Sequence, residues 1–143
     1  MTNATPDTPS DARKLTAVQE DYLAVIYREE MTEGLARGCR IAKAAGVTRS
    51  TVAMTLRALK AAGYVDYEPY GPIRLTEAGR AVGRAVADRR STLREFFANV
   101  MKLDAESAER FSHELEHCVT ADTLRRFDRF NTFYAAHAAM LNF

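Results

Sequence analysis

The 143-residue chain lacks tryptophan, holds only two cysteines and four prolines, and contains no apolar run long enough to cross a membrane. Cys39 and Cys118 are too few for a disulfide framework, so we expect the reducing cytoplasm as its compartment. No basic-then-apolar leader opens the chain, which predicts that no signal peptide is present. The 20 basic and 19 acidic residues leave a net charge of +1, which by itself argues against a nucleic-acid partner. Neither export nor a membrane partner is therefore expected.

One segment departs from this balance of charge. Between residues 36 and 63 no Asp or Glu occurs. The basic residues of the segment are Arg37, Arg40, Lys43, Arg49, Arg57 and Lys60. Local patches, not net charge, set the attraction to phosphates, so this segment is a candidate DNA-binding surface. A plain helical hairpin with a solvated basic face is the simpler interpretation, and the neighbouring elements argue against it.

The same segment has the pattern of a helix-turn-helix. Residues 41–45 predict a short helix that ends at Gly46, where a left-handed residue is needed. Thr48 then caps a second helix from Arg49 to about Ala62, and Gly63 ends it. On this helix the side chains expected to pack inward are Val52, Leu56 and Leu59. The opposite face carries small, hydroxyl and guanidinium groups, which suits the major groove of DNA.

A wing is predicted directly after these helices. Residues 64–67 alternate like a strand, residues 68–72 turn on Pro and Gly, and residues 73–75 return as a second strand. The hairpin places Tyr70 and Arg74 where they can reach the DNA backbone or a minor groove. The complete set of expected DNA-contacting residues is Arg40, Lys43, Thr48, Arg49, Ser50, Thr51, Met54, Arg57, Lys60, Tyr70 and Arg74.

Helices account for the rest of the chain. Thr16 and Gln19 form a capping box for a first helix that reaches about Thr32. After the wing we expect helices over 77–100, 105–118 and 121–141, capped by Thr76, Asp104 and Thr120. The predicted fold is mainly α: a flexible tail (1–14), a winged helix-turn-helix domain (15–78) and an all-helical domain (79–143). The apolar stripes of the last domain exceed what the small winged domain can cover, which predicts a homodimer.

A second motif is the sequence His-Glu-Leu-Glu-His at residues 113–117. His113, Glu116 and His117 are spaced to share one helical face, and two imidazoles with a carboxylate suit a first-row divalent metal. Phe111, Leu115 and Cys118 fall on the other face, which we expect to pack against the core. A solvent-exposed His/Glu face is the alternative interpretation of the same spacing.

The same five residues satisfy the H-E-x-x-H pattern of a zinc metallopeptidase, with Glu114 as the general base between ligands His113 and His117. The following residues lack the Gly and His of the longer signature. The chain is also short for a protease with a substrate cleft, and about a third of it already forms the predicted DNA-binding segment. We therefore expect no enzyme activity and no catalytic residue.

From about Thr16 to Arg129 the chain resembles the diphtheria toxin repressor family, in particular its short manganese-regulator branch. The resemblance is carried by residues 20–27, by the wing segment GYVDYEPYGPIRLTEAG and by residues 115–117. It implies a divalent metal as corepressor. The ligands that it implies here are Asp21 on the first helix and a later cluster of His113, Glu116 and His117. A carboxylate or thiol is more usual where His113 stands.

Two positions depart from the manganese-regulator pattern. Ala24 stands where a second carboxylate is usual, and Arg90 stands where a ligand histidine is usual. Arginine has no lone pair to offer a cation, so a two-metal site is in doubt. Either Asp21, His113, Glu116 and His117 hold one metal while Arg90 substitutes for a second cation, or Arg90 pairs with Asp21 and Glu116 and no metal is needed. We favour the first, because the two histidines have little reason to face a purely ionic pair.

The expected function is a metal-responsive DNA-binding transcriptional regulator that represses metal-homeostasis genes. Oxygen and imidazole ligands favour Mn(II), with Fe(II) and Zn(II) as alternatives. A metal shared by the two domains would set the spacing of two recognition helices on a palindromic operator, about 34 Å apart. A winged-helix regulator with a degenerate metal site, which is metal-independent or senses another effector, stays open.

Overall fold

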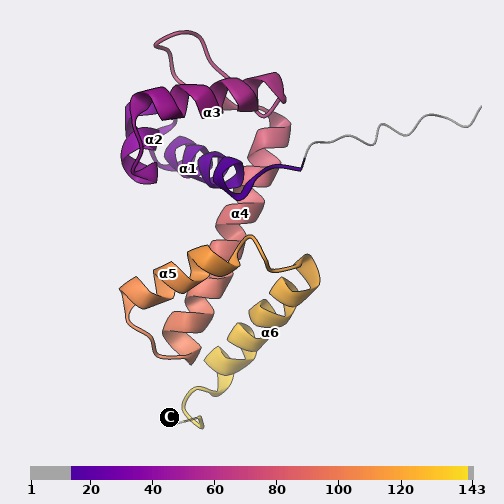
Figure 1. Cartoon of the computed structure of the whole chain (residues 1–143). Helices are drawn as coiled ribbons and strands as arrows, with labels where there is room; N and C mark the ends of the chain where they lie inside the picture. Colours follow the sequence, from indigo (N-terminus) through magenta and orange to yellow (C-terminus); the bar gives the residue numbers. More distant parts are fainter. Residues whose placement is uncertain (1–13, 142–143) are drawn as a thin grey trace, which may run out of the picture.

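The protein is described by a computed structural model that covers residues 14–141; most of the predicted tail, residues 1–13, lies outside this range. The helices are α1 (Ala17–Glu33), α2 (Gly38–Ala45), α3 (Arg49–Ala61), α4 (Glu77–Glu95), the π-helical η1 (Phe96–Val100), α5 (Ala105–Leu115) and α6 (Ala121–His137). In Figure 1, α4 runs from an upper part, built of α1 to α3 and a hairpin, into a lower part built of α5 and α6. None of the described helices combines the length and apolarity that crossing a bilayer requires.

The upper part is a winged helix-turn-helix. Thr16 and Gln19 form the predicted capping box of α1, and Gly34 ends that helix in a left-handed conformation. The inward face of α3 is the predicted one, with Val52, Leu56 and Leu59 buried. Helix α2 begins at Gly38, earlier than predicted, and ends at Gly46 as expected. These helices enclose a core to which α1 contributes an unbroken buried run from Tyr22 to Ile26.

The wing is shorter than its sequence pattern. Strands β1 (Val65–Asp66) and β2 (Arg74–Leu75) pair antiparallel, with Val65 opposite Leu75. Ile73 continues the pairing by a bridge to Ala36. The ladder closes early because the turn between the strands contains Pro69 and Pro72, which offer no N–H.

Helix α4 lies against the upper part through two glycines. At Gly83 a β-carbon would stand 2.5 Å from the carbonyl oxygen of Leu23 on α1. At Gly79 it would stand 1.9 Å from the carbonyl oxygen of Tyr64. These are contacts of backbone with backbone, so α4 and α1 approach more closely than any larger side chain allows.

Replacing Gly83 with alanine should therefore lower the free energy of unfolding by about 1–3 kcal/mol, as measured by urea denaturation. Alanine gains roughly 1 kcal/mol of helix propensity, but the clash is with a backbone carbonyl that cannot turn away. The control is Gly38→Ala, because a β-carbon at Gly38 meets no heavy atom within 4 Å. If the Gly83 variant were as stable as the Gly38 variant, the close packing of α4 on α1 would be wrong.

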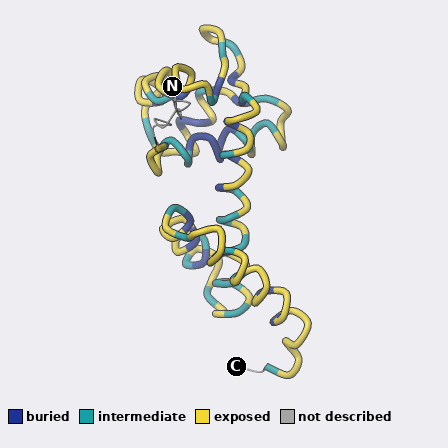
Figure 2. The backbone as a smooth tube through the Cα atoms, turned by 90° about the vertical axis from the view of Figure 1, so that its right-hand side faces the viewer, coloured by how far each residue is buried: buried dark blue, intermediate teal, exposed yellow. Residues whose placement is uncertain are grey.

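The lower part corrects one prediction. Phe111, Leu115 and Cys118 do not pack against the core but are exposed. The buried face of α5 instead carries Ala108 and Ser112, which are small enough to let α5 lie close to α4, and Ser112 donates its hydroxyl hydrogen to the Ala108 carbonyl. The apolar residues left exposed on this part include Phe111, Leu115, Phe130, Phe133 and Met140. Figure 2 shows how much of α5 and α6 is exposed compared with the upper part.

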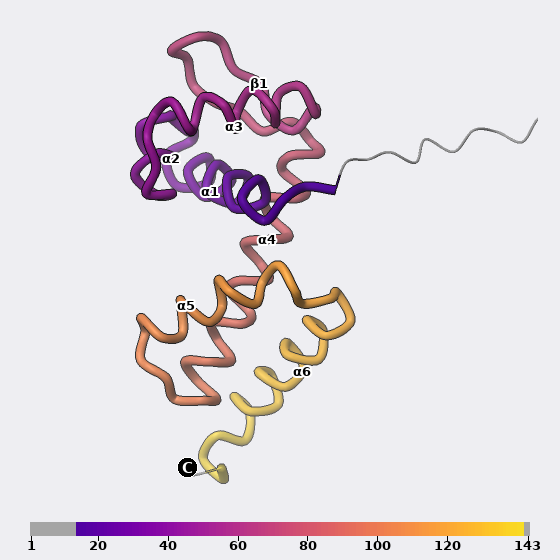
Figure 3. Tube along the Cα trace, viewed as in Figure 1, coloured from indigo at the N-terminus to yellow at the C-terminus, as the bar shows by residue number. Residues whose placement is uncertain are grey.

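Three helix ends also differ from the prediction. Helix α4 passes into the wider π-helical turn η1 instead of continuing as an α-helix to Val100, and α6 ends at His137 instead of Leu141. Helix α5 ends at Leu115 instead of Cys118. Figure 3 shows the result: α5 crosses α4 below α1, so that the end of α5 comes back toward the upper part.

Candidate metal centre and DNA-binding face

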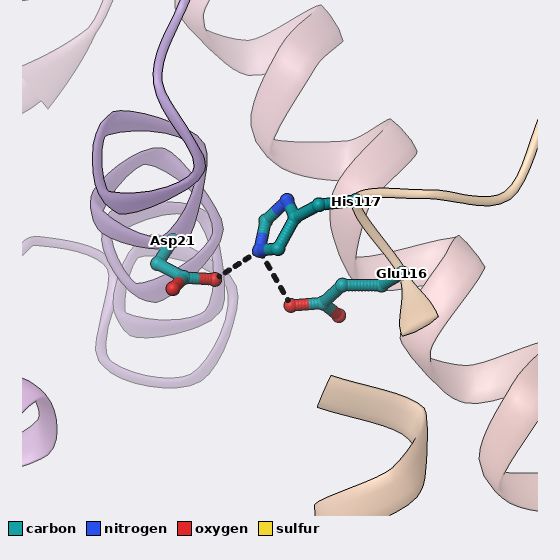
Figure 4. A group of neighbouring side chains, drawn as sticks. All are labelled: Asp21, Glu116 and His117. Atoms are coloured by element: carbon teal, nitrogen blue, oxygen red, sulfur yellow. Dashed lines mark hydrogen bonds and ion pairs between the residues drawn. The ribbon is translucent and has the colours of Figure 1, made fainter. Parts of the chain in front are cut away.

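Three of the predicted metal ligands meet where the two parts of the molecule touch. Asp21 of α1, Glu116 and His117 each offer one ligand atom, and the three atoms lie within 4.8 Å of one another. Nε2 of His117 is 3.0 Å from Oδ1 of Asp21 and 3.3 Å from Oε1 of Glu116 (Figure 4). One imidazole nitrogen and two carboxylate oxygens thus converge from distant parts of the sequence.

The end of α5 produces this arrangement. Glu116 caps the C-terminus of α5, its N–H donating to the Ser112 carbonyl at 3.0 Å, and His117 follows in the turn beyond. Glu116 and His117 still lie on the same side as His113: Nδ1 of His113 is 3.8 Å from Oε1 of Glu116, and the ring centroids of His113 and His117 are 6.2 Å apart. Because of this turn, the Glu116 side chain is fully buried and His117 reaches across to α1.

Arg90 of α4 lies in the centre of the cluster. Its Nε donates to Oε2 of Glu116 at 2.7 Å and its Nη2 to Oε1 at 2.5 Å, so the guanidinium forms a bidentate contact with the carboxylate. Nη2 also donates to Oδ1 of Asp21 at 3.4 Å. Burial lowers the pKa of Arg90, but the hydrogen bond and charge of Glu116, with Asp21 and Glu109, raise it above the ordinary value. Arg90 is thus a permanent cation shared by α1, α4 and the end of α5.

His113 stays beside the cluster rather than in it. Its Nδ1 lies 2.7 Å from Nη2 of Arg90 and must accept, because a guanidinium only donates. Its Nε2 is 3.5 Å from Oδ2 of Asp21, and half of its side chain is exposed. Glu114, the base of the metallopeptidase pattern, is exposed and does not belong to the ligand cluster found among the described residues.

The donors present suit one divalent cation. Two carboxylate oxygens and an imidazole nitrogen without a thiolate are ligands that first-row dications accept. The ion would share Asp21 and Glu116 with Arg90. A second ion finds no ligand at the two departing positions, since Ala24 is a buried alanine and Arg90 has no lone pair. The residues therefore fit one metal and not two.

Sequence reasoning missed Glu20 as a member of this site. Oε2 of Glu20 lies 2.8 Å from Nδ1 of His117, on the side of the ring opposite Asp21. Arg89 of α4 lies 3.6 Å from the same oxygen. No local signal indicates this, because consecutive residues of a helix point about 100° apart and only a group placed between them can touch both.

The residues predicted to bind DNA fall into two groups. Arg49, Met54 and Arg57 are exposed on α3, and a groove between α3 and the wing is lined by Arg49, Arg57 and Tyr70 among others. Tyr70 is fully exposed at the wing tip, with a left-handed φ of 63°. Exposed residues also include Lys43, Ser50, Thr51 and Arg74, while Thr48 accepts a hydrogen bond from Thr51 N–H as the cap of α3.

Two side chains predicted to contact DNA form ion pairs with other residues of the protein. Arg40 forms ion pairs at 3.2 Å with Glu29 and Glu33. Lys60 donates to the Tyr67 carbonyl at 2.7 Å and pairs with Asp66 at 3.2 Å. Among the described residues, the basic side chains predicted to contact DNA that lack such an ion pair are Lys43, Arg49, Arg57 and Arg74, all of them exposed.

Comparisons with known proteins match both parts of the chain. Residues 14–73 match the family described as "Iron dependent repressor, N-terminal DNA binding domain", and residues 76–137 match "Iron dependent repressor, metal binding and dimerisation domain". An uncharacterized HTH-type transcriptional regulator of Methanocaldococcus jannaschii is 32% identical over 113 residues, covering 78% of this chain and 90% of that one. The regulator MntR of Bacillus subtilis is 29% identical over 111 residues, covering 78% of each.

Solved structures are similar as well. A manganese-dependent transcriptional repressor in complex with manganese superposes with a TM-score of 0.73 at 28% identity, over 80% of this chain and 53% of that one. IdeR of T. acidophilum has a TM-score of 0.70 at 23% identity, over 82% of this chain and 55% of that one, which supports the fold alone. The chain spans about half the length of these solved chains.

Proposed function

This chain belongs to the iron-dependent repressor family of metal-dependent transcriptional regulators, and from that premise we propose how its metal acts. One divalent ion is held by Asp21, Glu116 and His117 and couples DNA binding to the dimer. The observation that carries the proposal is the convergence of these three ligand atoms within 4.8 Å. Asp21 belongs to the segment that matches the DNA-binding domain, whereas Glu116 and His117 belong to the segment that matches the metal-binding and dimerisation domain.

An ion bonded to both segments favours one orientation of α1 relative to α5. In a homodimer built through the predicted helical domain (79–143), that orientation sets the distance between the two α3 helices of the winged domains (15–78). Half-sites one DNA turn apart, about 34 Å, demand one such distance, which predicts a palindromic operator. Metal and DNA then strengthen each other's binding by the same factor.

Mn(II) is the proposed metal, with Fe(II) and Zn(II) as alternatives, because the set contains oxygen and imidazole donors but no thiolate. His113 is the proposed fourth ligand. While its Nδ1 accepts from Arg90, the ring proton of the neutral imidazole is on Nε2, so His113 coordinates the ion only when Nδ1 releases Arg90. A second ion lacks ligands, because Ala24 stands in place of a carboxylate and Arg90 in place of a histidine. Arg90 supplies positive charge instead of that ion.

A second candidate function rests on the two-pronged contact of Arg90 with Glu116. Arg90 already joins α4 to the end of α5 and to Asp21 of α1, which is the connection that a metal would make. In this version the protein binds DNA without metal, or responds to another effector.

The test is DNA binding of the full chain by fluorescence anisotropy, in chelator and with Mn(II), Fe(II) or Zn(II) at fixed salt. Duplexes selected from a random pool, once with metal and once with chelator, avoid a bias toward either candidate. We expect affinity to rise about 5–150-fold with the effective metal, the range of ordinary coupling energies. Equal, tight binding in chelator and in all three metals would overturn the metal proposal and favour the second candidate.

Arg49→Ala is the matched control for the DNA face. Because Arg49 lies on exposed α3 and touches no candidate ligand, its loss should weaken binding by about 1–3 kcal/mol both with metal and in chelator. An unchanged affinity would remove α3 from the DNA interface.

A further inference from the structure

We propose that Glu20 is a positioning residue for His117: it holds the ring proton on Nδ1 and so presents the lone pair of Nε2 to the metal. The inference rests on the proposed function, because it assigns a role toward the same ion. It adds to the site a carboxylate that binds no metal itself. The two consecutive acidic residues of α1 thus have different tasks, Asp21 as ligand and Glu20 as support for a ligand.

The geometry around the His117 ring carries the proposal. Nδ1 faces Oε2 of Glu20 at 2.8 Å, while Nε2 faces Asp21 and Glu116 at 3.0 and 3.3 Å. An ionised carboxylate can only accept, so a hydrogen bond to Glu20 requires the proton on Nδ1. A neutral imidazole has one ring proton, and with that proton on Nδ1 the lone pair of Nε2 points into the group of ligand atoms.

The carboxylates at the two nitrogens of the His117 ring differ in how closely neighbouring arginines bind them. Asp21 and Glu116 both accept hydrogen bonds from Arg90, so each is a weaker acceptor for the ring proton of His117. Glu20 is held by the more distant Arg89, at 3.6 Å, and its contact with His117 is the shortest of the three at that ring. Glu20 is therefore the carboxylate best placed to keep the proton.

The burial of the pair supports a positioning role. His117 and Glu20 are 16% and 22% exposed, and they come from elements nearly one hundred residues apart. A carboxylate that accepts from the distal nitrogen of a ligand histidine fixes the ring orientation and raises its basicity toward the metal. Removing such a partner lowers metal affinity by about 10–100-fold.

The experiment uses the full chain with Glu20→Ala and Glu20→Gln. The first readout is the long-range ¹H–¹⁵N NMR spectrum of the metal-free protein, at a pH where the ring is neutral. The chain has three histidines, so the His117 signals can be assigned. We expect protonated Nδ1 in the wild type, a shift of the proton toward Nε2 in Glu20→Ala, and retention in Glu20→Gln, whose carbonyl can still accept. The second readout is Mn(II) affinity by calorimetry, expected to fall about 10–100-fold in Glu20→Ala and less in Glu20→Gln.

The control is Glu33→Ala, which removes a half-exposed carboxylate from the same helix and should change neither readout. An unprotonated Nδ1 in the wild type, or a Glu20→Ala variant with wild-type Mn(II) affinity, would overturn the role of Glu20 while the metal proposal stands. If the wild type binds no Mn(II), or Asp21→Ala binds it equally well, the metal proposal fails. In that case the NMR result alone decides whether Glu20 positions His117.

Discussion

Replacing Arg90 with methionine should lower the free energy of unfolding of the metal-free protein by about 3–5 kcal/mol. The reason is Glu116, which is fully buried and has both carboxylate oxygens bonded to Arg90. Without the guanidinium a buried negative charge remains, and Asp21 adds a second one nearby. The measurement is urea denaturation in the presence of chelator.

Added Mn(II) should restore part of this loss, because an ion on Glu116 and Asp21 replaces the missing positive charge and binds only the folded chain. Arg94→Met is the matched control on α4. Arg94 pairs with Glu109 at 3.2 Å with half of its side chain exposed, so its loss should change stability by no more than about 0.5 kcal/mol. Equal losses in the two variants would show that the contact of Arg90 with Glu116 stabilises no more than a surface pair.

The second large effect is expected from His117→Ala. This variant should lose the whole metal-dependent gain in DNA affinity, about 5–150-fold, while its affinity in chelator stays at the wild-type level. His117 is the nitrogen donor of the three-atom ligand group, and it is not part of the buried core. Anisotropy titrations with and without Mn(II) measure the effect, and analytical ultracentrifugation measures the dimer.

His137→Ala is the control, because His137 lies near the end of α6 and faces the Phe133 carbonyl, away from the ligands. A His117→Ala variant that still responds fully to Mn(II) would remove His117 from the site. Glu116→Ala is a less clean test, although the spacing of the motif made it an equal choice. Its removal also leaves Arg90 without its main partner, so stability and metal response would change together.

Local signals in the sequence predicted most of the helix starts. Thr16, Thr48, Thr76, Asp104 and Thr120 all cap helices as expected, since a cap depends on a few adjacent residues. The end of α5 was not predictable in the same way. No Gly or Pro follows Leu115, and the helix stops there in the turn that buries Glu116 beside Arg90.

The prediction of which face of α5 packs inward was wrong for a related reason. Hydrophobic periodicity places Phe111 and Leu115 inward, but the inner face carries Ala108 and Ser112, because the neighbouring helix α4 lies too close for larger groups. The contacts of Arg90 with Asp21 and Glu116 were one of two outcomes that the sequence left open. The role of Glu20 required the three-dimensional position of His117, which lies 97 residues away.

The glycine contacts of α4 have a mechanical consequence. Because Gly79 and Gly83 bring the helix backbone against the backbone of the upper part, we expect α4 to move together with that part. Its 19 residues make a lever about 28 Å long. A tilt of about 5° at the lower end therefore displaces the upper end by more than about 2 Å, which approaches the 3.4 Å rise of one base pair. We therefore expect a small change in the contacts of Arg90 to alter how well the two α3 helices match the register of the double helix.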